Sequence, residues 1–249
     1  MARVADRVAP RTAKAYDHTE GSIIGSILRM GVPSMIGFAL GNIYDLVDMY
    51  WLSRLGPGPV AAITILSPLL WVVHSANMIV GAGSVAIISR RYGEKNPLQT
   101  ALAIRETILL KWIAAIAFGL LGYASAPLVM RWLGAEGSVL DQAVIYGRII
   151  FLGLGFNFAT YSVFTAMRGI ANPNLAMGLM ISLNVLNMLL DPVLIFGWWI
   201  FPALGVAGAA WASVISYALS FSAGMLLLSS GRTNVRLSQT NRRPIQWAI

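Results

Sequence analysis

The sequence consists mainly of long apolar runs, separated by short segments rich in Arg, Lys, Gly and Pro. A helix crosses a bilayer core about 30 Å thick with roughly 20 apolar residues. Because unpaired backbone groups are not tolerated in hydrocarbon, such runs must fold as helices or closed barrels, and runs of this length favour helices. We therefore predict an all-α integral membrane protein, a six-helix bundle with spans at residues 27–52, 61–88, 101–126, 139–167, 175–200 and 203–229.

Composition excludes a water-soluble domain. Only 11% of the 249 residues are charged and 57% are hydrophobic, whereas soluble domains carry about 25% charged residues. The net charge of +8 does not indicate nucleic-acid binding, because the basic residues fall at the ends of the predicted spans. The chain has no cysteine, which excludes disulfides and thiolate metal sites.

The distribution of basic residues predicts the orientation in the membrane. Most lie in a basic arm (1–22), in the polar segment after the second span, in the loop after the fourth, and in a basic tail (231–249). The opposite side clearly receives only Arg54 and Arg131. Since basic loops stay on the cytoplasmic side, both arm and tail are expected in the cytoplasm, with the six-helix unit (23–230) in the inner or plasma membrane.

Three carboxylates interrupt apolar runs. Asp45 and Asp48 lie in the first predicted span, and Asp191 lies in the fifth. A charge near the bilayer centre costs roughly 2.5–3.5 kcal/mol, so such residues normally face a bundle interior and handle ions, protons or substrate. Asn187 precedes Asp191 by four residues and shares its helix face. Carboxylates with an amide oxygen suit a hard cation such as Na⁺, or a proton held on a carboxyl group.

Four segments carry a resemblance to a known family. The segment YDLVDMYWLSRLG (44–56) resembles the first-helix pattern Y-N-L-V-D of the multidrug and toxic compound extrusion (MATE) transporters. SRRYGEKN (89–96) and TAMRGIANPN (165–174) are similar to two of the family's loops. NMLLDPVLIFG (187–197) followed by GVAGAAWASVIS (205–216) is similar to its fifth and sixth helices. The four matches occur in family order, and the position of Pro33 is similar to that in the archaeal and DinF-like branch.

The resemblance implies a secondary transporter rather than an enzyme, without a cofactor. Family members exchange H⁺ or Na⁺ for amphipathic, often cationic, drugs or toxic metabolites, by alternating access between two six-helix lobes. This chain resembles the first lobe only. The resemblance therefore implies a half-transporter or a fragment, whose second lobe comes from homodimerisation or from a missing C-terminal half.

The resemblance also implies roles for individual residues. A first group would bind and couple the cation: Asp48, Asn187, Asp191 and Ser213, with Na⁺ possible at the first three. A second group would line the substrate cavity: Tyr44, Asp45, Tyr146 and Asn184. Pro33 would provide the bend of the first helix.

Three alternatives stay open. An intramembrane hydrolase would use two carboxylates as acid and base, but the G-x-G-D companion motif of aspartyl proteases is absent before Asp191. A lipid-linked precursor flippase would need more cationic residues lining the cavity. The third alternative is a protein that folds in the membrane without transporting anything, and it would bind no substrate.

Among the other charges, Lys111 and Arg148 are expected to extend toward the interfaces, and Arg168 to anchor a cytoplasmic loop.

Overall fold

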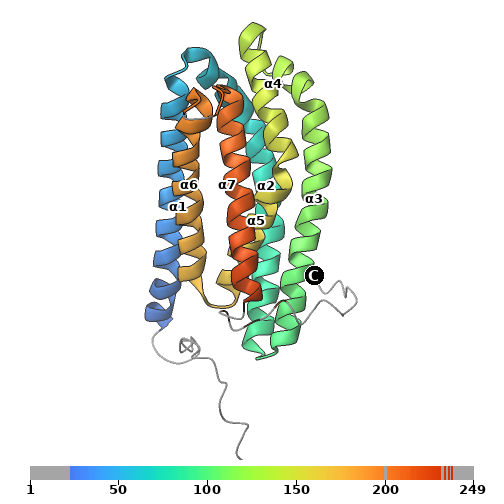
Figure 1. Ribbon diagram of the computed structural model, residues 1–249. Helices are drawn as coiled ribbons and strands as arrows, with labels where there is room; N and C mark the ends of the chain where they lie inside the picture. The colour runs from blue at the N-terminus through green and yellow to red at the C-terminus, as the bar shows by residue number, and fades with distance from the viewer. Residues whose placement is uncertain (1–22, 199–200, 231–232, 234, 236, 238–249) are drawn as a thin grey trace, which may run out of the picture.

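The computed structural model describes residues 23–198, 201–230, 233, 235 and 237, and within them the chain forms seven α-helices and no strand (Figure 1). The predicted basic arm and most of the predicted basic tail lie outside the described residues. The helices are α1 (Ile23–Ser53), α2 (Pro57–Gly93), α3 (Pro97–Trp132), α4 (Gly137–Leu152), α5 (Leu154–Gly169), α6 (Pro173–Phe196) and α7 (Val206–Ser229). The predicted all-α class is confirmed.

The helices run up and down along a common direction, and the turns alternate between two ends of the bundle (Figure 1). The start of α1, the α2–α3 turn, the α5–α6 turn and the end of α7 lie at the lower end in this view. That end carries Arg90, Arg91, Lys95 and Arg168, whereas Arg54 and Arg131 lie near the turns at the opposite end. The charge asymmetry expected from the sequence is therefore an asymmetry between the two ends of the folded bundle.

Four of the described helices, α2, α3, α6 and α7, are long and apolar enough to cross a membrane. The pair α4 and α5 makes a fifth span if the two are counted together. Helix α1 falls outside this count, although it has 31 residues and lies beside α6 along the bundle. Its second half carries Asn42, Asp45 and Asp48, which lower its apolar character.

The predicted span at 139–167 is not one straight helix. Helices α4 and α5 meet at Gly153 with a bend of 52°. Two glycines, Gly153 and Gly155, weaken the helix at this point. Both are also packing positions, because a Cβ on Gly153 would meet Val214 and one on Gly155 would meet Trp112.

The helix that contains the third predicted span (101–126) does not end at Pro127, the residue that follows this span. Helix α3 continues through this residue to Trp132. Proline removes one backbone hydrogen bond from a helix but need not end it where neighbouring helices hold both sides. Helix α3 packs against α2, α4 and α5, which provide that support.

Close approaches at glycines fix how α6 packs against its neighbours. A Cβ on Gly208 of α7 would meet the Leu194 carbonyl of α6. A Cβ on Gly37 of α1 would lie 3.1 Å from Met180 Sδ, also on α6. Small residues at such positions allow helix backbones to come close within a membrane. Helix α6 therefore connects α1 and α7, whereas α1 makes only limited contact with α2.

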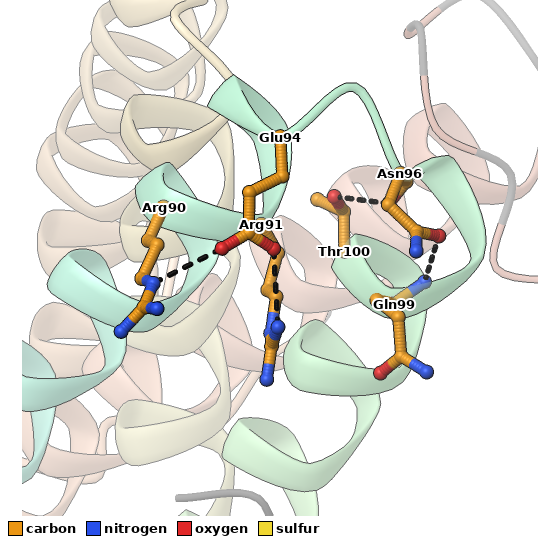
Figure 2. A network of polar contacts seen from close by, with 6 residues as sticks. All are labelled: Arg90, Arg91, Glu94, Asn96, Gln99 and Thr100. Carbon is orange, nitrogen blue, oxygen red and sulfur yellow. Dashed lines mark hydrogen bonds and ion pairs between the residues drawn. The ribbon is translucent and has the colours of Figure 1, made fainter.

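The turn between α2 and α3 is built from polar contacts (Figure 2). Arg90 Nε and Arg91 Nη1 donate to the two carboxylate oxygens of Glu94, each at 3.0 Å. The Asn96 side chain caps α3 by accepting from the Gln99 N–H at 3.1 Å. The hydrogen bonds from Arg91 and Arg90 hold the pKa of the Glu94 carboxyl group below its ordinary value.

We expect Glu94→Gln to change how stability depends on pH. A carboxyl group with a lowered folded-state pKa stabilises the fold above its ordinary pKa of 4.5, and this contribution is lost as pH falls through the lowered value. The variant should therefore be slightly less stable than the parent at pH 7 and equally stable well below pH 4.5. Thermal unfolding in detergent across this range measures the difference; a gap that persists at low pH would contradict the prediction.

Candidate functional site: a carboxylate cluster between α1, α6 and α7

Asp48 of α1 and Asp191 of α6 are buried in the same region of the bundle. Their side chains are 8% and 0% exposed, and the two carboxyl groups are close enough to interact electrostatically. Asp48 Oδ1 has no hydrogen-bond partner among the described residues. Because two like charges in a buried region repel each other, this pair is stabilised by any cation that binds to it.

A chain of hydrogen bonds joins Asp191 to two other helices. The orientation of the Asn187 amide that satisfies its neighbours places Nδ2 2.8 Å from Asp191 Oδ2 and 3.2 Å from Oδ1. The Asn187 oxygen then accepts from the Ser213 hydroxyl of α7 at 3.3 Å. The Tyr44 hydroxyl of α1 lies 3.2 Å from Ser213 Oγ. Since Ser213 donates to Asn187, Tyr44 donates to Ser213, and the whole chain of donors ends at the Asp191 carboxylate.

Tyr146 of α4 completes the carboxylate cluster, which we define as Tyr44, Asp48, Tyr146, Asn187, Asp191 and Ser213. Tyr146 is buried, and its hydroxyl group interacts electrostatically with both Asp48 and Asp191. The cluster thus draws residues from four helices that are far apart in the sequence. Every predicted coupling residue lies in it, together with two of the predicted cavity residues.

The remaining predicted residues lie at its edge or outside it. Asp45 is exposed on α1, but it interacts electrostatically with Asp48. Asn184 is half-buried on α6, and no described contact joins it to the cluster. Pro33 is half-buried within the unbroken helix α1, about 22 Å along the helix from Asp48 at 1.5 Å per residue.

The oxygen atoms of the cluster fit a small cation or a proton. The two carboxylates, the Asn187 amide and the Ser213 hydroxyl are hard ligands of the kind that Na⁺ prefers. The described residues contain no group of three or more His, Asp or Glu side chains that would hold a transition metal. Asp48 Oδ1 is buried without a hydrogen-bond partner among the described residues, so a bound cation or proton would stabilise this atom.

Some polar residues that the fold buries or half-buries could not be predicted from the sequence. Tyr217 of α7 interacts electrostatically with Tyr44 and Tyr146. Lys111 does not extend toward an interface as expected, because its side chain is 1% exposed inside the bundle. A lysine in an apolar run gives no signal of which way it faces, since lipid-facing and core-facing positions are equally apolar.

Comparisons with known proteins identify relatives of this chain. The chain is 29% identical over 213 residues to the probable multidrug resistance protein YoeA of Bacillus subtilis, which covers 85% of this chain and 46% of that protein. It is 26% identical over 224 residues to a protein of Shewanella oneidensis named FAD transporter, covering 89% and 50% of the two chains. The chain therefore spans about half the length of these relatives.

The fold is shared with a solved transporter structure. A MOP superfamily transporter from Pyrococcus furiosus, described as having a binding pocket of reverse polarity, superimposes with a TM-score of 0.84 at 25% identity. The match covers 94% of this chain and 51% of that one. The sequence profile of the MatE family matches residues 33–193. The chain is a multi-pass membrane protein that belongs to the MatE family, whose members are secondary transporters and not enzymes.

Proposed function

We propose that this chain is one lobe of a cation-coupled antiporter that exports amphipathic, cationic drugs or toxic metabolites. The observation that carries the proposal is the burial of Asp48 and Asp191 in one polar cluster, where one carboxylate oxygen has no hydrogen-bond partner among the described residues. Carboxylates in this setting are retained in membrane proteins where they bind ions, protons or charged substrates. Asp48, Asn187, Asp191 and Ser213 bind H⁺ or Na⁺ in this scheme.

Competition for the two carboxylates couples the cation to the drug. When both are ionised, their negative charge attracts a cationic compound from the cytoplasmic side. Entry of H⁺ or Na⁺ from outside neutralises them, removes this attraction and favours bending of α1 at Pro33. Tyr44, Asp45, Tyr146 and Asn184 line the space from which the drug is displaced.

The names of the relatives do not decide the cargo. YoeA is named for multidrug resistance, whereas the Shewanella protein is named for FAD, which is an anion. We base the cationic cargo on the cluster itself, since among its described residues only carboxyl groups are readily ionised at neutral pH. None of the described residues of the cluster is cationic, which disfavours a lipid-linked precursor flippase at this site.

A second lobe is required for alternating access. We propose that it comes from a second copy of this chain or from the remainder of a longer protein. The basic end of the bundle, with Arg90, Arg91, Lys95 and Arg168, would face the cytoplasm. Native mass spectrometry in lipid nanodiscs separates the two cases, because only the first gives a stable homodimer.

Efflux of tetraphenylphosphonium from proteoliposomes tests the function. The parent chain, reconstituted together with its second lobe, should export it when a Na⁺ or a proton gradient is imposed, and Asp48→Asn should export it at least about tenfold more slowly, because one charge-assisted interaction with the cation is lost. Glu136→Gln, which neutralises an exposed carboxylate beyond the end of α3, is the matched control and should behave like the parent. Equal rates in parent and Asp48→Asn would reject the coupling role.

A further inference from the structure

A cavity of about 390 Å³ lies between α1, α2, α3 and α5. Its walls include Phe38, Asn77, Met78, Lys111, Thr165 and Arg168. Phe38 precedes Asp48 by ten residues, which is about 15 Å along the helix. This space, which we call the cationic cavity, is therefore separate from the carboxylate cluster and lies toward the basic end of the bundle.

Lys111 places an uncompensated positive charge in this cavity. Its side chain is 1% exposed, and it has no ion-pair or hydrogen-bond partner among the described residues. A Cβ on Gly81 would lie 3.4 Å from Lys111 Nζ and 3.8 Å from Thr165 Oγ1, so the missing side chain of Gly81 leaves room for both groups. A buried ammonium without a counter-ion is strongly unfavourable.

Arg168 increases this charge instead of balancing it. It is close enough to Lys111 for the two cations to interact, and its guanidinium lies over the Phe38 ring, 5.7 Å from the centroid. No Asp or Glu of the described part of the chain lines the cavity. The cavity walls therefore carry two positive charges that no described carboxylate in the lining neutralises.

Asn77 is an independent sign of a ligand. Its side chain is 1% exposed and lines the cavity, yet neither Nδ2 nor Oδ1 has a hydrogen-bond partner among the described residues. Buried amides nearly always find a partner in a folded protein. The amide Nδ2 adds two N–H donors to those of Lys111 and Arg168.

We propose that the cationic cavity binds the phosphate group of an organic phosphate, in a site distinct from the carboxylate cluster. Lys and Arg together with an amide and a hydroxyl supply enough donors for three phosphate oxygens, and the two positive charges match the charge of a phosphate monoester. Phe38 and Met78 provide apolar wall for the organic part of the ligand. The phosphate belongs either to a membrane lipid or to a soluble compound.

Two probes distinguish these sources. Phenyl phosphate, with benzyl alcohol as its uncharged counterpart, represents a soluble ligand. Phosphatidic acid, a lipid phosphate monoester added to the full chain in a neutral maltoside detergent, represents a lipid. The readouts are the melting temperature and, for the lipid, its retention in native mass spectrometry. The variant is Lys111→Met, and the control is Lys95→Met, which removes the same charge from an exposed turn.

Either probe supports the proposal if it raises the melting temperature of the parent and of Lys95→Met, but not of Lys111→Met. Without a probe, Lys111→Met should fold and melt at or above the parent temperature, since it removes an unpaired buried charge. Asn77→Leu provides a second test, with at least about tenfold weaker binding of the same probe, because the amide donors are lost. Equal stabilisation of the parent and Lys111→Met by both probes, or stabilisation by neither, would overturn the assignment.

Discussion

Asp191→Asn is expected to raise the cation concentration for half-maximal efflux by about tenfold to a hundredfold. The Asp191 carboxylate is the end of the donor chain from Tyr44 through Ser213 and Asn187. A hydrogen bond to a charged group contributes about 1.5–3 kcal/mol, which corresponds to roughly this range of affinity. The rate of tetraphenylphosphonium efflux is measured in one series of Na⁺ concentrations and in one series of pH values. Each series gives the concentration of Na⁺ or H⁺ at which efflux is half-maximal.

The control for this variant is Asp141→Asn, which removes an exposed carboxylate from the start of α4. It should leave the half-maximal concentration unchanged. If Asp191→Asn titrated like Asp141→Asn with both ions, Asp191 would have no part in cation binding, and its burial would need a purely structural explanation.

Gly208→Ala is expected to destabilise the fold by about 3 kcal/mol, the upper end of the usual penalty for overpacking. The new Cβ would meet the Leu194 carbonyl and would lie 2.8 Å from Ile195 N. Both atoms belong to the backbone of α6, so no side chain can rotate to make room. The free energy of unfolding in mixed detergent micelles measures the loss.

Gly178→Ala is the matched control, since nothing lies within 4 Å of the Cβ that it would add to α6. It should be neutral or more stable by up to about 1 kcal/mol, because alanine favours helix more than glycine does. Equal stability of the two variants would indicate that α6 and α7 pack less closely than the structure indicates.

Part of the carboxylate cluster could be predicted because carboxylate and amide side chains are rare in apolar runs. Asp48 and Asp191 stand out for this reason, and the spacing of Asn187 to Asp191 places both on one face of α6. Ser213 and Tyr146 could not be found that way, since serine and tyrosine are common in membrane helices. They came only from the family resemblance.

The cationic cavity could not be predicted, because its residues share no pattern along the chain. Asn77 and Lys111 belong to different helices, and neither helix has one polar face opposite one apolar face. Without one polar face, periodicity does not indicate which side is buried. The break at Gly153 was missed for a related reason, since the run through α4 and α5 stays apolar on both sides of it.

The unequal packing of α1 determines how a motion of this helix would be distributed. Helix α1 is held along α6, where Gly37 receives Met180, and is tied to α7 by the bond from Tyr44 to Ser213, whereas its contact with α2 is limited. A displacement toward or away from α2 therefore breaks fewer interactions than one across α6. The side of α1 with limited contact to α2 is also the side on which the cationic cavity lies, so a bend at Pro33 toward or away from α2 would change the width of that cavity.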